Sequence, residues 1–134
     1  MECIFCDIAG GEKSGYIVYN DNQTMAILDI FPAVEGHLMV IPKKHGETVL
    51  DYSKDELGVT MEVVKKIIKA LTKTYYTKVF TVGINHAEKL GVPHLHVHII
   101  PRYEDDNGGI IQKIVTKPSK NSLKDVTNKI KSNI

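Results

Sequence analysis

The chain has 134 residues with 17 basic and 16 acidic side chains, so it fits one domain and carries no charge excess that would attract nucleic acid or acidic membranes. Its apolar fraction of 43% is ordinary for a globular protein, and no apolar run reaches the ~20 residues of a membrane span. The first residues resemble no signal peptide, so we expect a cytoplasmic protein without nucleic-acid or membrane partners.

Short strands and turns alternate over the first third of the chain. Residues 16–19 and 25–28 are rich in strand-forming side chains and flank a turn at residues 20–22, which predicts an antiparallel hairpin. Residues 38–41 form a third apolar run that ends at Pro42.

One long helix is predicted for residues 54–75. Ser53 and Glu56 have the spacing of a capping box. Apolar side chains follow at helical spacing, namely Leu57, Met61, Val64, Ile67, Ile68 and Leu71. Residues 79–84 predict a fourth strand, and the histidine-rich segment from His94 predicts a fifth. A short closing helix is predicted from the spacing of Leu123, Val126 and Ile130. This order of elements is typical of an α+β fold with an antiparallel five-stranded sheet.

The predicted fifth strand carries the chain's most informative pattern. His94, His96 and His98 alternate with Leu95, Val97 and Ile99, so the imidazoles share one face and the aliphatic side chains the other. Imidazoles titrate near neutral pH, bind metals and act as nucleophiles.

Four interpretations of this row compete. The histidines could be a chance pattern on a half-exposed strand, or two of them could bind a catalytic metal. The first and third lie ~13 Å apart at ~3.3 Å per residue, so one ion cannot easily bind all three. A third interpretation is nucleophilic attack on phosphorus, in which the neighbours orient the ring and contact the phosphate. The fourth is a nucleotide-binding module that only holds phosphate.

The two cysteines, Cys3 and Cys6, are too close in sequence to cross-link a domain. A redox pair should follow a strand and open a helix, and no strand precedes this one. Half of a tetrahedral zinc site, completed by histidines elsewhere, and a pair of idle thiols both stay open.

Residues 94–100 match the alternating signature of the histidine triad (HIT) family, and further segments match it in the family's order at residues 3–8, 29–32 and 36–45. The chain resembles the zinc-bearing prokaryotic hydrolases of that family, in the branch of the nucleoside phosphoramidases, with the dinucleoside polyphosphate hydrolases as close kin. The resemblance reaches Arg102 and implies a single HIT-like domain over residues 1–134. Its core would be residues 1–103, with residues 104–134 as a C-terminal extension.

The resemblance implies a reaction at the α-phosphorus of a nucleotide substrate. His96 would attack, a nucleotidyl-histidine would form, and water would release a nucleoside monophosphate. His94 or a neighbouring carbonyl would fix the tautomer of His96, and His98 would contact phosphate oxygens, without a catalytic cofactor. The alternatives are a non-catalytic purine-nucleotide-binding or zinc-stabilised interaction protein, and a nucleotidyl transferase, whose relatives carry Gln where this chain has His98.

The resemblance also implies a substrate site. Asp29 would bind the ribose hydroxyls, while His37 and Asn85 would lie near the base or phosphate. The slot for the purine base would be apolar and draw on Ile8, Leu28, Phe31 and Ile41. Many relatives supply polar donors just before the triad, but residues 85–93 contain neither Gln nor Ser or Thr. The backbone of Gly91 could replace them, as could His86 or Lys89, although a solvated loop explains the latter two equally well.

In zinc-bearing relatives the metal is bound by residues that match Cys3, Cys6, His45 and His94. Two thiolates and two imidazoles form a closed tetrahedral site, so this zinc would be structural. Members of the family are usually homodimers, which makes the long helix and the fourth strand the candidate contact surfaces.

Overall fold

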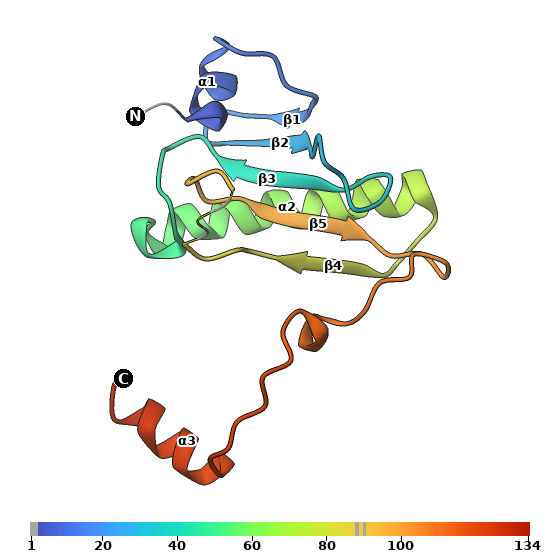
Figure 1. Cartoon of the computed structure of the whole chain (residues 1–134). Coiled ribbons are helices and arrows are strands. Elements are labelled where there is room, and N and C mark those ends of the chain that lie inside the picture. Colours follow the sequence, from blue (N-terminus) through green and yellow to red (C-terminus); the bar gives the residue numbers. More distant parts are fainter. Residues whose placement is uncertain (1–2, 88, 90) are drawn as a thin grey trace.

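The computed structural model describes residues 3–87, 89 and 91–134, and it contains a five-stranded antiparallel sheet covered by one long helix (Figure 1). The strands are β1 (Ile17–Asn20), β2 (Thr24–Leu28), β3 (Leu38–Pro42), β4 (Phe80–Gly83) and β5 (Val97–Pro101). Their order across the sheet is β1-β2-β3-β5-β4, and β1 and β2 form the expected hairpin. The predicted α+β class is confirmed. No helix among the described residues is long and apolar enough to span a membrane.

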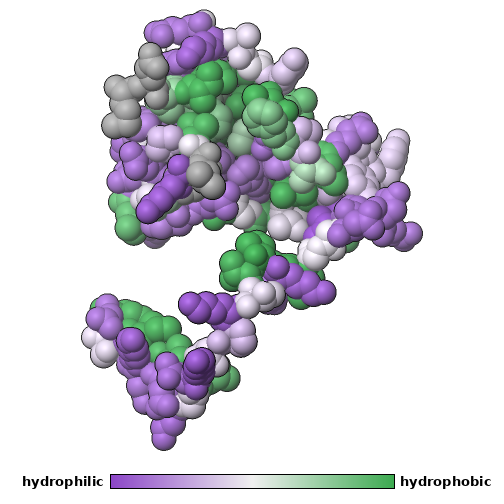
Figure 2. Space-filling model, viewed as in Figure 1, coloured by the Kyte–Doolittle hydropathy of each residue, from purple (hydrophilic) through white to green (hydrophobic). Residues whose placement is uncertain are grey.

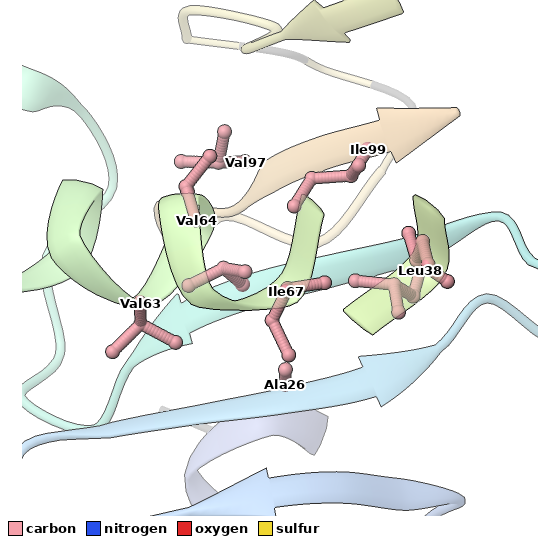
Figure 3. Close-up of a cluster of buried hydrophobic side chains, with 9 residues drawn as sticks. Ala26, Leu38, Val63, Val64, Ile67, Val97 and Ile99 are labelled. Carbon is pink, nitrogen blue, oxygen red and sulfur yellow. The ribbon is translucent and has the colours of Figure 1, made fainter. Parts of the chain in front are cut away.

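Helix α2 (Lys54–Tyr75) covers one face of the sheet and has the predicted bounds. Ser53 accepts a hydrogen bond from the amide of Glu56, whose carboxylate accepts one from the amide of Ser53. Figure 3 shows the core beneath the helix, which contains Val63, Val64, Ile67, Ala26, Leu38, Val97 and Ile99. Met61 was expected on this buried face but is 46% exposed, and Thr60 and Val63 are buried instead.

The opposite face of the sheet is covered over β2 and β3 by helix α1 (Ile4–Gly10), which was not predicted. The helix has only seven residues, and its N-cap, Cys3, makes no side-chain capping bond, so the usual sequence signals are missing. Phe5 and Ile8 are buried between the helix and the sheet.

Strand β5 begins at Val97, so the prediction that the strand starts at His94 is wrong. The amide of Leu95 donates to the carbonyl of Gly46, in the segment after β3, instead of joining the ladder of β3 itself. The alternation of side chains persists, because Val97 and Ile99 still pack under α2.

The remaining elements are two short 3-10 helices, η1 (Val49–Asp51) and η2 (Ile111–Lys113), and helix α3 (Leu123–Lys131). The terminal helix forms where the sequence predicts it. It does not close the fold, because none of its side chains is buried and it stands apart from the sheet (Figure 1).

Candidate active site and metal centre

Four metal-binding side chains from three distant segments meet beside α1. Nδ1 of His94 lies 3.3 Å from Sγ of Cys3 and 3.6 Å from Sγ of Cys6. Nδ1 of His45 lies 3.4 Å from Sγ of Cys6 and 3.3 Å from Nδ1 of His94. All four ligand atoms lie within 4.8 Å of one another.

This cluster fits zinc in both spacing and chemistry. A tetrahedral site with Zn–S of ~2.3 Å and Zn–N of ~2.05 Å separates two nitrogens by about 3.3 Å and a nitrogen from a sulfur by about 3.5 Å. The carbonyl of Pro42 accepts a hydrogen bond from Nε2 of His94 at 2.7 Å, which leaves the lone pair of that ring on Nδ1, inside the cluster. Burial lowers the pKa of His94, so its imidazole is neutral at pH 7.

Tyr52 holds the backbone on both sides of His45. Its hydroxyl donates to the carbonyl of Lys44 at 2.7 Å and lies 3.2 Å from the carbonyl of Gly46. Burial raises the pKa of Tyr52, so the hydroxyl keeps its proton. A Cβ at residue 46 would lie 2.6 Å from the tyrosine ring, so only glycine fits there. No sequence pattern predicts this pair, because the contact depends on the course of the chain after β3.

The second histidine of the row has a defined tautomer. Nδ1 of His96 donates to the carbonyl of His94 at 2.6 Å, which places the lone pair of the ring on Nε2. The ring of Phe5 lies edge-on to His94 and His96, with centroids 5.9 and 5.3 Å away. Phe5 is 5% exposed and therefore fixes both rings from the side of α1. Its role, too, was not predicted from the sequence.

The third histidine belongs to a chain of hydrogen bonds. The amide of Ala33 donates to Nδ1 of His37 at 3.0 Å, so the proton of His37 is on Nε2. That atom lies 2.9 Å from Nδ1 of His98 and donates to it, which places the proton of His98 on Nε2. Burial lowers the pKa of His37, although the charge of Asp29 partly opposes this effect.

Asp29 lies beside this histidine pair. Its Oδ2 is 3.5 Å from Nε2 of His37 and 3.8 Å from Nδ1 of His98, and its Oδ1 accepts from the amide of Phe31 at 2.8 Å. The loop that carries Asp29 ends at Gly36, with φ of +85° and no room for a Cβ because the ring of Tyr75 is 2.5 Å away. Glycine at this position therefore lets the loop bring Asp29 and His37 together.

Two of the residues expected in the apolar slot, Ile8 and Leu28, lie together, and the slot itself stays a prediction. Ile8 and Leu28 line a hollow of about 260 Å³, together with Tyr16, Ile27 and Ile30. Phe31 directly follows Ile30 in the sequence and is 85% exposed. Ile41 is fully buried beneath α1, so its expected contact with a base is wrong.

The loop before the triad is mostly exposed where the structure describes it, and its Val92 carbonyl accepts a hydrogen bond from the amide of His94 at 2.7 Å. Asn85 and Gly91 are both exposed. Their roles stay predictions. His86 and Lys89 are exposed as well, which agrees with a solvated loop.

Comparison with known proteins places this geometry in context. The family model described as "HIT domain" matches residues 10–105. An uncharacterized HIT-like protein of Methanocaldococcus jannaschii is 42% identical over 106 residues, covering 78% of this chain and 81% of the relative. The adenosine 5'-monophosphoramidase of Saccharomyces cerevisiae is 34% identical over 110 residues, covering 81% of this chain and 68% of the enzyme.

Solved structures agree with the sequence comparisons. A member of the HIT family from Bacillus subtilis aligns with a TM-score of 0.84 and 33% identity, covering 99% of this chain and 95% of that one. A zinc-bound histidine triad family protein from Mycobacterium smegmatis aligns with a TM-score of 0.74 and 30% identity, covering 80% of this chain and 79% of that one.

Proposed function

The chain belongs to the histidine triad family, and on this basis we propose that it is a nucleotide hydrolase that acts through a nucleotidyl-histidine intermediate. Its substrates would be nucleoside phosphoramidates or dinucleoside polyphosphates, and cleavage would occur at the α-phosphorus. The observation that carries the proposal is the hydrogen bond from Nδ1 of His96 to the carbonyl of His94 at 2.6 Å. It leaves a lone pair on Nε2, the atom that the reaction needs as nucleophile.

The reaction then has two steps. Nε2 of His96 bonds to the α-phosphorus while the bond from phosphorus to the leaving amine or nucleotide breaks. Water next attacks the same phosphorus, breaks the phosphorus–nitrogen bond to His96 and releases the nucleoside monophosphate. The Nε2 proton of His98 donates to a phosphate oxygen, where negative charge accumulates in both steps.

The remaining site residues would position the nucleotide. The carboxylate of Asp29 would accept hydrogen bonds from ribose hydroxyls, and His37 would hold His98 in the donating tautomer. The hollow at Ile8 and Leu28 would receive a purine base, and the exposed ring of Phe31 would add to this apolar slot. Asn85 and the backbone of Gly91 would contribute polar donors to the phosphate or leaving group.

We propose that Cys3, Cys6, His45 and His94 bind one structural zinc ion. Four protein ligands leave no position for substrate, so the metal would fix α1 beside the triad and take no part in the chemistry. The zinc-bound M. smegmatis relative supports this assignment. We also propose that two copies of the chain associate, as the family resemblance implies.

Replacement of His96 by alanine tests the enzyme proposal against the alternative of a non-catalytic purine-nucleotide-binding or zinc-stabilised protein. The matched control is His86→Ala, in the exposed loop. Release of AMP from adenosine phosphoramidate and from diadenosine tetraphosphate is measured by chromatography. We expect turnover in the wild type and the control and none in His96→Ala. Nucleotide binding without turnover in the wild type would support the non-catalytic alternative.

A further inference from the structure

The loop between β2 and β3 carries several of the proposed nucleotide contacts. We call residues 29–37 the substrate loop, and its two ends supply Asp29 and His37. Amides from the middle of the loop orient both side chains. The amide of Phe31 donates to Oδ1 of Asp29 at 2.8 Å. The amide of Ala33 donates to Nδ1 of His37 at 3.0 Å. The position of the middle of the loop therefore decides how these two side chains point.

Two tyrosines from distant segments support the substrate loop. The hydroxyl of Tyr103 donates to the carbonyl of Glu35 at 3.1 Å, although the two residues are 68 positions apart in the sequence. The ring of Tyr75, at the end of α2, lies so close to Gly36 that a Cβ there would be 2.5 Å from it. The two tyrosine rings meet edge to face, with centroids 6.5 Å apart. Tyr75 thus fixes the ring of Tyr103, whose hydroxyl holds the backbone of the loop.

The segment that carries Tyr103 is fixed to the sheet. The carboxylate of Asp106 accepts from Nε of Arg102 at 2.7 Å, from its Nη2 at 3.0 Å and from the amide of Tyr103 at 2.9 Å. Nη1 of the same guanidinium donates to the hydroxyl of Thr81 on β4 at 3.1 Å, and the amide of Arg102 donates to the carbonyl of Val79 at 2.9 Å. The side chain of Asp106 is 7% exposed, so solvent screens this ion pair less than a surface pair. Tyr103 therefore donates from a segment that β4 and β5 hold in place.

The end of the sheet where these parts meet faces solvent. Figure 1 shows the substrate loop, the end of α2 and the segment after β5 at this end. The surface of the segment after β5 is hydrophilic (Figure 2), and Glu35, Glu104 and Asp105 are exposed. Burial of apolar surface therefore does little to fix the position of Glu35, and its hydrogen bond to Tyr103 is the specific contact that holds the carbonyl.

We propose that Tyr103 is a positioning residue for the nucleotide site. Its hydroxyl holds the substrate loop, so that the amides in the middle of the loop orient Asp29 and His37, and Tyr103 acts through those two side chains. This inference rests on the proposed function and deepens it. Because Asp29 would bind the ribose hydroxyls, Tyr103 supports a preference for nucleotides in which those hydroxyls are free.

The first test measures binding without turnover. Tyr103→Phe removes the hydroxyl and keeps the ring against Tyr75, and Tyr76→Phe is the matched control because Tyr76 is 93% exposed. Calorimetric titrations use AMP and 2′,3′-dideoxy-AMP, which lacks the hydroxyls that Asp29 would bind. We expect Tyr103→Phe to bind AMP about three- to tenfold more weakly than the wild type, which is the range for loss of one hydrogen bond. The fold-loss for dideoxy-AMP should be less than about half of the fold-loss for AMP, and the control should match the wild type.

The second test measures turnover and stability of the same variants. The KM of Tyr103→Phe for adenosine phosphoramidate should rise by about the same factor as its Kd for AMP. Its Tm should stay close to that of the wild type, because the carbonyl of Glu35 lies at an exposed position and water can replace the lost donor. Asp106→Asn weakens the ion pair that holds the segment of Tyr103, and it should raise KM in the same direction.

The outcomes separate this inference from the proposed function. Equal fold-losses for AMP and dideoxy-AMP in Tyr103→Phe, or an unchanged affinity for AMP, would overturn the inference. A wild type that binds the two nucleotides equally would overturn it as well, because Asp29 would then not recognise ribose. A wild type that prefers AMP, loses this preference in Tyr103→Phe and hydrolyses no adenosine phosphoramidate or diadenosine tetraphosphate would overturn the proposed hydrolase and support the inference.

Discussion

Tyr52→Phe should weaken the metal centre although Tyr52 is not a ligand. The hydroxyl donates to the carbonyls of Lys44 and Gly46, on both sides of His45. Phenylalanine keeps the ring against Gly46 and removes only the donor. The variant therefore isolates the contribution of the hydroxyl to the position of His45.

The expected magnitude follows from the burial of the group. Tyr52 is 8% exposed, and loss of its hydroxyl removes the donor to the carbonyl of Lys44 at a cost of about 1–3 kcal/mol, whereas the carbonyl of Gly46 still accepts from the amide of Leu95. A chain of 134 residues unfolds with an entropy of roughly 0.28 kcal/mol/K, so the free-energy loss corresponds to a fall in Tm of about 4–11 °C. Loss of a residue that orients a ligand should lower zinc affinity by about 10- to 100-fold.

The assay measures thermal unfolding and competition for zinc with a chromophoric chelator. Tyr76→Phe is the matched control, because Tyr76 is 93% exposed at the end of α2. The control should behave like the wild type in both measurements. If Tyr52→Phe and Tyr76→Phe have the same Tm and the same zinc affinity, the argument that Tyr52 supports the metal centre is wrong.

Three further predictions concern protonation and loop geometry. Burial raises the pKa of the Cys6 thiol to about 11, so zinc must displace its proton, and affinity measured by competition should rise by about tenfold or more per unit from pH 6 to 8. Burial lowers the pKa of His37 below 6.5, so the stability that neutral His37 provides is complete above pH 6.5 and is lost as the pH falls below it. His37→Gln should therefore lose less stability than the wild type in urea titrations between pH 7 and 5. Gly36→Ala should raise KM for adenosine phosphoramidate and lower Tm, because a Cβ would meet Tyr75 at 2.5 Å and φ is +85°.

Each of these predictions has a contradicting result. A zinc affinity that is independent of pH would mean that Cys6 is no ligand. Parallel stability profiles for wild type and His37→Gln would remove the argument for a buried neutral His37. Unchanged KM and Tm in Gly36→Ala, with Gly10→Ala as the unhindered control, would show that the loop tolerates a Cβ.

Local chemical signals predicted much of this fold. The bounds of α2 were correct because Ser53 and Glu56 satisfy each other's backbone groups at its start. Helix α1 was missed because it is short and has no side-chain cap. The amphipathic pattern of α3 predicted its position, but the expectation that it closes the fold was wrong, because such a pattern does not indicate whether a helix packs on its own chain.

In the candidate site, the types of the residues could be predicted from the sequence, but most of their contacts could not. The ligand types of Cys3, Cys6, His45 and His94 could be recognised from the sequence, and the structure brings them together. The tautomer of His96 is fixed by the carbonyl of His94, as one of the two stated alternatives expected. The tautomer of His94 could not be predicted, because it depends on the carbonyl of Pro42 in a distant segment, and that of His37 depends on the course of the loop that brings the amide of Ala33 to its ring. Phe5 and Tyr52 were missed for the same reason, since their roles arise only from tertiary contacts.

The most direct test of the account is the identity of the nucleotidylated residue during turnover. Wild-type protein is mixed with adenosine phosphoramidate, quenched within milliseconds and analysed by mass spectrometry of the peptide that contains residues 94–98. The account predicts an adenylyl group on Nε2 of His96 that appears before free AMP and decays as AMP accumulates. Rapid turnover with an adduct on another residue, or with no adduct on His96 at any time, would contradict it.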